Sequence, residues 1–474
     1  MEVVVNRIVV ALFACALALS GCSQPGSQAP YDIVLAGGRV MDPASGLDAI
    51  RNVGVREGLI AAVTEDTLEG TRVIDASGLV VAPGFIDLHV HGQTDYSFTF
   101  MIRDGVTSGF ELEVGTGDVE GWYRKRQGGQ RANYGVSVGH IPTRIAVMND
   151  PGDFLPAGAA KNEPASDEQI EAMRRRIREG LDQGAVAVGF GTAYTPGASV
   201  AEFETMMAVA ADYGTSAHIH VRGGLDGLDE AIDTAARTGT ALHVVHANSS
   251  GGMETPAFLA RIEEARARGQ DVTTEAYPYG AGQTRIESAL FDDWESWDDE
   301  QFGIHQWVAT GERMTRASFA TYREQGGAII IHNRPEAMTR AAIESPLTMI
   351  ASDGGIGNGR GHPRGSGTFS KVLGHYVREE GVLTLMDALR RMTIEPARRL
   401  ETYVASMKNK GRLQVGADAD ITLFNPDTVI DKSTYENAAV PPDGIPYVIV
   451  NGVLVVDDGE LVENVHPGKP IRKN

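Results

Sequence analysis

The chain has 474 residues, with 42 lysines and arginines against 63 aspartates and glutamates, so its formal charge is −21 at pH 7. That length is enough for a large core and for more than one domain. The acidic balance argues against a nucleic-acid-binding protein, which presents a basic face.

The N-terminal segment is typical of a targeting signal rather than of a folded domain. An apolar run over 8–19, short for a membrane-spanning helix, leads into the letters LSGC that end at Cys22. This ending resembles the lipobox of bacterial lipoproteins, which implies a signal peptide over 1–21, cleavage before Cys22 and acylation of its thiol. Residues 22–30 would then form a tether, and the protein would be lipid-anchored in the bacterial cell envelope, periplasmic or at the outer membrane. An ordinary secretory signal is the alternative. Because Cys15 is the only other cysteine, the mature chain would have no disulfide and no cysteine ligand.

Short β-segments with turn residues occupy both ends of the remaining chain. Residues 31–82 contain the turn pair Gly37-Gly38, and residues 406–474 repeat the pattern with Asn451-Gly452 as a tight turn. Two β-rich ends that flank a different kind of segment predict one small β-sandwich domain built from both termini.

Residues 83–405 alternate short apolar runs with amphipathic stretches, the pattern of βα units around a parallel sheet. Eight candidate strands favour an α/β fold of the (β/α)8 TIM-barrel type, whose catalytic residues lie at the carboxyl ends of the strands. A doubly wound open sheet is the alternative, but no GxGxxG follows an early strand. Residues 280–346 are too long for a plain connection and predict an insertion or lid. The candidate strands are 84–91, 106–114, 133–140, 185–191, 216–222, 241–247, 271–278 and 347–355.

Two carboxylates lie on one face of the second candidate strand. Glu111 and Glu113 are two residues apart in an otherwise apolar run, so their side chains point to the same side. Burying both is costly unless something cationic meets them. We expect a metal centre there, with arginines or backbone donors as the alternative.

Histidines collect at the ends of other candidate strands. His89 and His91 close the first strand, His220 and His246 end the fifth and sixth, and Asp353 ends the eighth. A lone histidine at such a place is more often structural, but this set at one barrel mouth is the ligand set of a zinc-type hydrolytic site. The other histidines on or beside strands are expected to be structural or to support the ligands: His140, His218 and His243.

These segments resemble a known family. "APGFIDLHVHG" (82–92), followed by His220, His246 and "ASDGG" (351–355), resembles the amidohydrolase superfamily. "HVRGG", "EAYPYGAG" and "GHPRGSGTF" are similar to segments of the N-acyl-D-amino-acid deacylases, or D-aminoacylases, and the resemblance runs from Tyr31 to about Val465. It implies one or two zinc ions, held by His89, His91 and Asp353 on one side and by His220 and His246 on the other.

The ligand between the metals departs from the family pattern. Related sites use a carbamylated lysine or, in D-aminoacylases, a cysteine near the end of strand two. This chain has no lysine between Lys161 and Lys371 and no cysteine beyond residue 22, whereas Glu113 lies beside the aligned place. We therefore expect the Glu113 carboxylate to bridge the metals, since zinc accepts carboxylate oxygen, and Glu111 is the alternative.

The resemblance and the positions of residues relative to the strands together predict catalytic and substrate contacts. Asp353 would take a proton from the metal-activated water and deliver it to the departing nitrogen. Tyr194, just after the fourth strand, is placed to donate to the developing oxyanion, and a packing role beside Pro196 is the alternative. Arg222 lies two residues after His220, on the same face of the candidate strand, and we expect it to contact the substrate. The other expected contacts near these strand ends are Tyr277, Arg364 and Asn248, the last at a place where some relatives have lysine.

The predicted activity is zinc-dependent hydrolysis of the linear amide bond of N-acyl-D-amino acids, which releases a carboxylate and a free D-amino acid. The strand that carries Glu111 and Glu113 is similar to that of D-glutamate deacylases and favours acidic substrates. The partners are then this small molecule and, through Cys22, the membrane. Two alternatives stay open: a cyclic amide or imide hydrolase similar to dihydroorotases or hydantoinases, and a metal-binding surface lipoprotein without catalysis.

Overall fold

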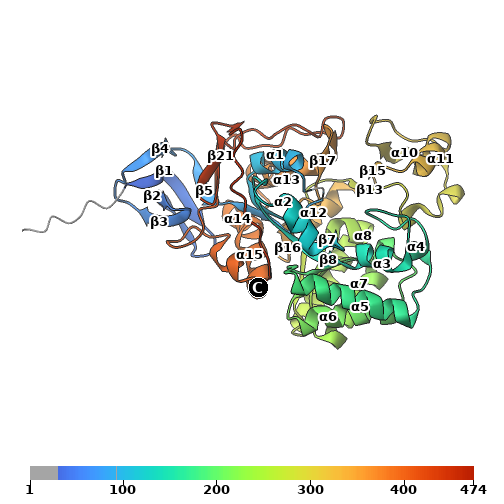
Figure 1. Ribbon diagram of the computed structural model, residues 1–474. Coiled ribbons are helices and arrows are strands. Elements are labelled where there is room, and N and C mark those ends of the chain that lie inside the picture. The colour runs from blue at the N-terminus through green and yellow to red at the C-terminus, as the bar shows by residue number, and fades with distance from the viewer. Residues whose placement is uncertain (1–29, 92, 474) are drawn as a thin grey trace, which may run out of the picture. The chain divides into compact units, whose positions relative to one another are not determined.

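A computed structural model describes residues 30–91 and 93–473 (Figure 1). The predicted signal peptide and the acylated Cys22 lie outside these residues, so they stay predictions. Among the helices in the described ranges, none combines the length and the apolar character that crossing a membrane requires.

The central sheet has eight parallel strands within the described residues, and it confirms the predicted barrel. The first and last strands meet through backbone bonds: the Asp353 N–H donates to His89 O and the His91 N–H donates to Gly354 O, both at 2.8 Å. Most of these strands are buried along their length, as expected where helices cover the outer face of a parallel sheet. In spatial order the strands are β6 (Phe85–Asp87), β7 (Val106–Thr116), β8 (Asn133–Gly139), β9 (Val188–Gly191), β10 (Ser216–His220), β11 (Ala241–Val244), β12 (Val272–Ala276) and β16 (Thr348–Ile350).

Amphipathic helices connect these strands. In α5 (Asp167–Asp182), Ser166 and Gln169 form a capping box that starts the helix, and Met173, Ile177 and Leu181 bury one face at helical spacing. The other helices of the barrel region are α1 (Asp95–Arg103), α2 (Val119–Arg126), α3 (His140–Met148), α4 (Ala159–Asn162), α6 (Val200–Asp212), α7 (Gly224–Thr238), α8 (Ala247–Gly251), α9 (Thr255–Ala267), α12 (Glu336–Glu344), α13 (Arg364–Lys371), α14 (Leu385–Met392) and α15 (Ile394–Glu401).

A second sheet takes strands from both ends of the chain, as predicted, and it has nine strands in the part that the structure describes. β1 turns at Gly37, which has a φ of +69°, so that its first half pairs with β4 and its second half with β5. β5 also pairs with β19, which joins the two ends of the chain. The strands are β1 (Tyr31–Asp42), β2 (Leu47–Arg56), β3 (Leu59–Thr64), β4 (Gly70–Asp75), β5 (Val80–Pro83), β19 (Ile421–Phe424), β20 (Tyr447–Val450), β21 (Val453–Asp457) and β22 (Glu460–Leu461).

The last residues do not join that sheet. The Ile471 N–H donates to Tyr134 O (2.8 Å), and the Tyr123 hydroxyl donates to Ile471 O (2.6 Å), so this tail packs against β8 and α2 of the barrel. The expected β-domain over 406–474 therefore ends before the tail.

The insertion over 280–346 forms a small body with its own core. Among the described residues of this segment, β13 (Gly282–Arg285), β15 (Ala328–Ile331) and β14 (His305–Trp307) pair as an antiparallel sheet. Beside it lie α10 (Asp299–Gly303) and α11 (Arg316–Gln325). The apolar cluster of this segment is Ile286, Phe291, Trp297, Phe302, Trp307, Met314, Phe319 and Ile329.

Candidate metal centre and active site

The two oxygens of Glu113, on β7, face two different groups of side chains. Oε2 lies 2.9 Å from His89 Nε2 and 3.1 Å from His91 Nε2. Oε1 lies 2.8 Å from His220 Nδ1 and 3.9 Å from His246 Nε2. A carboxylate with one oxygen toward each group is the arrangement needed to bridge two cations, as the sequence predicts for Glu113.

Asp353 completes the first group. Its Oδ1 lies 3.5 Å from His89 Nε2 and 3.2 Å from His91 Nε2. One ligand atom from each of His89, His91, Glu113 and Asp353 lies within 4.8 Å of the others, close enough to hold one metal ion. Glu113, His220 and His246 form the second such group. Imidazole nitrogens and carboxylate oxygens are the ligands that zinc accepts, so this donor set fits the implied metal.

The backbone is in an unusual conformation at two of these positions. His246 has a φ of +37° and Asp353 a φ of +51°. Both values lie in the left-handed region, which residues other than glycine rarely adopt. Each follows the end of a barrel strand, where the chain turns outward. Such conformations cost of order 1–3 kcal/mol and persist where the surrounding structure enforces them, typically at functional sites.

Acidic partners behind the ligands fix the orientation of the first two rings. Glu275 on β12 accepts from His89 Nδ1 (2.6 Å) and from His243 Nε2 (2.9 Å). Glu111 accepts from His91 Nδ1 (2.8 Å) and from the Val114 N–H. The bonds made by Nδ1 of His89 and of His91 leave the Nε2 lone pair of each ring free to face the metal site. Glu111, the alternative bridging ligand, therefore lies behind His91 and does not face both groups.

Sequence reasoning missed Glu275. Its signal was the one that marked Glu113, an acid in a buried strand, but the strand "DVTTEAYP" begins with polar residues and looks less apolar. His243 forms a hydrogen bond with Glu275, and His140 forms one with Glu202 on α6. The His218 ring lies beside that of His243, with centroids 4.6 Å apart and planes tilted by 33°. These three histidines support the structure, as expected.

The site is charged in a pattern that suits cations. Burial acts to raise the pKa of Glu113, but the His220, His89 and His91 rings hold it well below its usual value. Burial likewise acts to raise the pKa of Glu275, and the His89 and His243 rings lower it to about 2. Both carboxyls are therefore ionised at neutral pH.

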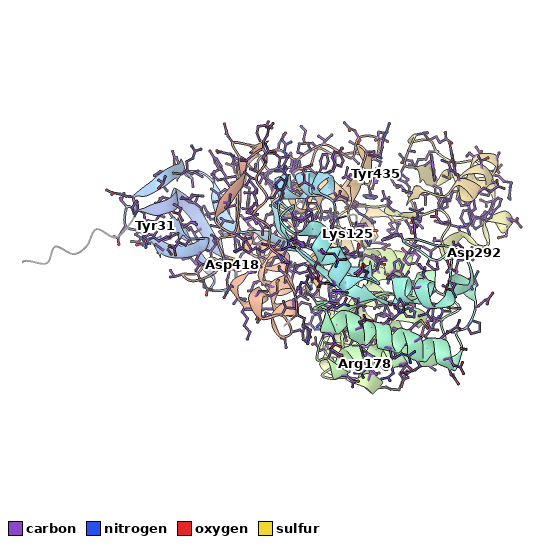
Figure 2. The ribbon with its side chains drawn as sticks, in the orientation of Figure 1. Tyr31, Lys125, Arg178, Asp292, Asp418 and Tyr435 are labelled. Carbon is purple, nitrogen blue, oxygen red and sulfur yellow. The ribbon has the colours of Figure 1, made fainter. Side chains whose placement is uncertain are left out.

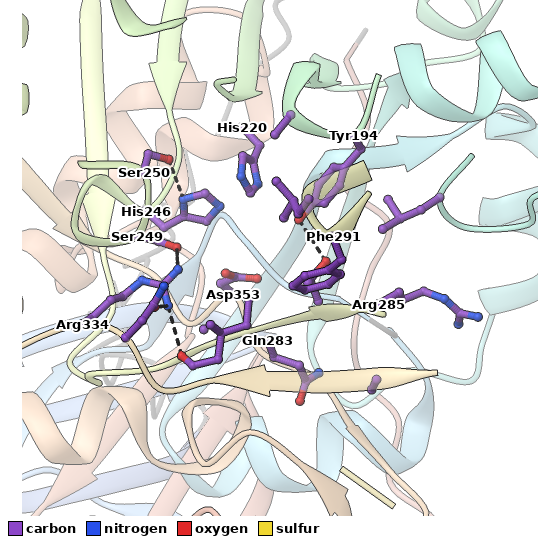
Figure 3. A pocket seen from close by; sticks show the side chains of 18 of the residues that line it. Tyr194, His220, His246, Ser249, Ser250, Gln283, Arg285, Phe291, Arg334 and Asp353 are labelled. Carbon is purple, nitrogen blue, oxygen red and sulfur yellow. Dashed lines mark hydrogen bonds between the residues drawn. The ribbon is translucent and has the colours of Figure 1, made fainter. Parts of the chain in front are cut away.

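A cavity of about 490 Å³ opens in front of these ligands. Figure 3 shows Tyr194, His220, His246 and Asp353 around this cavity. The Tyr194 ring lies 4.8 Å from that of His220, and its hydroxyl accepts from Thr284 Oγ1 (3.3 Å). The insertion contributes one wall: Gln283, Thr284, Arg285, Leu290, Phe291, Trp297, His305, Ile331 and Arg334.

Arg364, predicted to bind substrate, lines this cavity and pairs with Asp353. Its Nη2 lies 2.9 Å from Asp353 Oδ1, and its guanidinium carbon lies 4.6 Å above the Tyr277 ring. Arg364 is buried, and its Nε and Nη1 have no hydrogen-bond partner in the described chain. Tyr277 lies beneath Arg364 rather than on the cavity wall, and its buried hydroxyl is likewise without a partner in residues 30–91 and 93–473.

The structure does not bring Arg222 and Asn248 to the cavity wall. β10 ends at His220, so the alternation that placed Arg222 beside it does not continue. The Arg222 guanidinium instead pairs with Glu230 (2.5 Å) and donates to Ala198 O. Asn248 is buried and donates to Tyr277 O (2.9 Å).

An eight-stranded barrel with two histidine groups, a shared carboxylate and an aspartate at its carboxyl mouth defines a metal-dependent hydrolase. Comparison with known proteins agrees with this class. Residues 147–456 match the model of the amidohydrolase family, and the chain belongs to that family. It is a hydrolase that acts on carbon–nitrogen bonds other than peptide bonds.

Two proteins of Alcaligenes xylosoxydans xylosoxydans are similar over nearly their whole length. An N-acyl-D-glutamate deacylase is 30% identical over 94% of this chain and 98% of its own, and a D-aminoacylase is 32% identical over 95% of this chain and 99% of its own. A crystal structure of the N-acyl-D-glutamate deacylase from Bordetella bronchiseptica, with zinc and a phosphonate mimic of the tetrahedral intermediate, matches with a TM-score of 0.82 and 27% identity. The match covers 94% of this chain and 100% of the chain in that crystal structure.

Proposed function

We propose that this chain hydrolyses the amide bond of N-acyl-D-amino acids with zinc held at the Glu113 site, releasing a carboxylic acid and a free D-amino acid. The position of Asp353 carries the proposal. Its Oδ1 lies 3.2 Å from His91 Nε2 and 2.9 Å from Arg364 Nη2. A single carboxylate thus stands between the ligand group and a buried guanidinium, which suits a substrate that carries a carboxylate beside its amide. The similarity to deacylases that act on D-amino acids supports the D configuration of the proposed substrate.

The residues that would hold zinc are those of the two groups that share Glu113. Bound there, zinc supplies Lewis acidity that polarises a carbonyl and lowers the pKa of water. Glu275 and Glu111 keep the His89 and His91 rings turned toward that position.

Asp353 and Tyr194 supply the proton transfers and hydrogen bonds of the reaction. Burial acts to raise the pKa of Asp353, but Arg364 and His89 hold it far below its usual value, so the carboxylate is ionised. In this form it can accept a proton from the attacking water. It then passes that proton to the departing nitrogen, which leaves as an amine. Burial and Glu113 raise the pKa of Tyr194 well above its usual value, so its hydroxyl stays protonated and donates to the developing oxyanion.

The test is an assay of the purified, zinc-loaded protein on N-acetyl-D-glutamate and N-acetyl-D-methionine, with both L-enantiomers as controls. We expect release of D-amino acid, loss of activity with a chelator and its return with zinc. Asp353→Asn should lower kcat about a hundredfold or more, because it removes the proton carrier. The Arg222 side chain lies away from the cavity. Arg222→Gln therefore serves as the matched control and should keep the wild-type kcat.

Two results would contradict the proposal. Hydrolysis of hydantoins or dihydroorotate without hydrolysis of linear substrates would identify a cyclic amide hydrolase. Tight zinc binding without turnover of any of these compounds would identify a metal-binding protein.

A further inference from the structure

Three arginines line the cavity within the described chain, and they differ in what neutralises them. Arg285 pairs with Glu287, and Arg364 pairs with Asp353. Arg334, which follows β15, has no carboxylate partner in residues 30–91 and 93–473. Its hydrogen bonds go to the neutral acceptors Ser249 Oγ (2.5 Å), Asn333 Oδ1 (3.0 Å) and Ile331 O (3.4 Å).

Arg334 is thus a half-buried positive charge on the cavity wall without a counter-ion. Its Nε is buried and lacks an acceptor in the described chain. Figure 3 shows its guanidinium joined to Ser249, at the edge of the pocket that also holds Asp353. A guanidinium that lines a cavity and lacks a carboxylate partner offers a binding point for an anion.

The adjacent strand leaves room for this guanidinium. A Cβ placed on Gly282, at the start of β13, would lie 2.7 Å from Arg334 Nη1 and 2.9 Å from Nη2. The carbonyl of the next residue, Gln283, accepts from Arg364 Nη2 (3.3 Å). The guanidinium groups of Arg334 and Arg364 therefore lie next to successive residues of β13, so two positive charges neighbour each other on the cavity wall.

We infer that Arg334 binds a second carboxylate, on the side chain of the substrate, so that the enzyme acts on N-acyl derivatives of acidic D-amino acids. The inference rests on the proposed function, with the α-carboxylate of the substrate at Arg364, whose Nε and Nη1 have no hydrogen-bond partner in the described chain. Arg334 is then the residue that sets side-chain specificity. The apolar part of the wall, with Phe154 and Phe291, is left for the acyl group.

The decisive experiment compares N-acetyl-D-glutamate with N-acetyl-D-glutamine, which have nearly the same shape and differ by one charge. The wild-type protein should prefer the glutamate by about tenfold or more in kcat/KM, the scale of one charge-assisted hydrogen bond. Arg334→Gln should remove that preference, with the loss confined to the charged substrate, and Arg334→Lys should restore part of it. Arg285→Gln, which removes a lining arginine already paired with Glu287, should keep the wild-type ratio.

A second variant moves the guanidinium without removing it. Gly282→Ala introduces a methyl group where the end of the flexible Arg334 side chain now lies, so the fold is kept and the guanidinium is displaced. The preference for glutamate should fall in this variant as well.

Each other outcome overturns the inference. Equal loss on both substrates in Arg334→Gln would place the α-carboxylate at Arg334. A wild-type preference for the glutamine or for N-acetyl-D-methionine would show that the cavity selects neutral side chains while the proposed function stands. If the wild type cleaves no N-acyl-D-amino acid at all, the proposed function fails together with the inference.

Discussion

At the scale of single residues, Glu113 holds the candidate centre together. One carboxylate faces His89 and His91 with one oxygen and His220 with the other. Its loss therefore affects both groups at once, whereas the loss of Glu111 only frees the Nδ1 side of the His91 ring.

Glu113→Gln is expected to reduce zinc content to about one ion per chain or fewer, because it removes an anionic ligand atom from each group. Glu111→Gln should retain the metal and weaken its affinity about tenfold to a hundredfold, as is usual for partners that orient a ligand. Elemental analysis and a zinc competition titration measure both quantities. Equal metal content in the two variants would refute the bridging role.

The site was predictable as far as its residues obey simple spacing. Buried acids and histidines at strand ends pointed to a metal centre, and the family resemblance singled out Glu113 as the bridging ligand. Arg222 was placed wrongly because period-two alternation holds only while a strand continues, and β10 ends at His220. Arg334 gave no signal, since its position depends on an insertion that folds back over the barrel mouth.

At the scale of elements, the insertion is tied to the barrel by Asp292. This residue, labelled in Figure 2, follows Phe291 in the chain. It accepts hydrogen bonds from Lys161 Nζ (2.8 Å) and Asn162 Nδ2 (3.2 Å) at the end of α4. It also forms an ion pair with Arg323 of α11. The same carboxylate thus connects a wall of the cavity to the barrel and to the core of the insertion.

Asp292→Asn should loosen this connection with little effect on the fold. We expect a loss of about 1 kcal/mol or less in the free energy of unfolding, the usual worth of partly exposed ion pairs. Limited proteolysis of the insertion should become faster, and KM should rise because Phe291 is less firmly placed. Glu300→Gln, on an exposed position of α10, is the control, and identical proteolysis of the two variants would contradict the role of Asp292.

The barrel strands were predictable because short apolar runs alternate regularly with amphipathic stretches over residues 83–405. The strands of the insertion were not, since β14 has three residues and β13 and β15 have four each, and no regular alternation with helices marks them as it marks the equally short β6 and β16. Periodicity cannot be judged over such lengths, and the pairing of these strands is decided by the aromatic cluster beside them.

At the scale of the whole molecule, buried polar contacts join the barrel to the sheet built from both chain ends. Asn133, the first residue of β8, donates to Asp420 Oδ2 (2.9 Å) and accepts from Asn451 Nδ2 (2.7 Å). Lys410 donates to the same Asp420 oxygen (2.7 Å).

Asn133→Ala is expected to destabilise the protein by about 2–3 kcal/mol, because it leaves buried polar partners unsatisfied on both sides of this junction. Urea unfolding followed by tryptophan fluorescence measures the change. Zinc content should stay at the wild-type level, since Asn133 lies at the amino end of its strand and the ligands lie at the carboxyl ends. Unfolding of the terminal sheet seen by circular dichroism, while the tryptophan signal of the barrel and insertion is unchanged, would show that the two parts unfold independently.

The backbone bonds that close the barrel have a consequence for biosynthesis. The Asp353 N–H binds His89 O and the His91 N–H binds Gly354 O, so the segment that completes the ligand set is also the one that seals the cylinder. A nascent chain still lacking that segment has neither a closed barrel nor a full set of metal ligands. Closure of the cylinder and completion of the first ligand group therefore depend on the same late-synthesised segment of the chain.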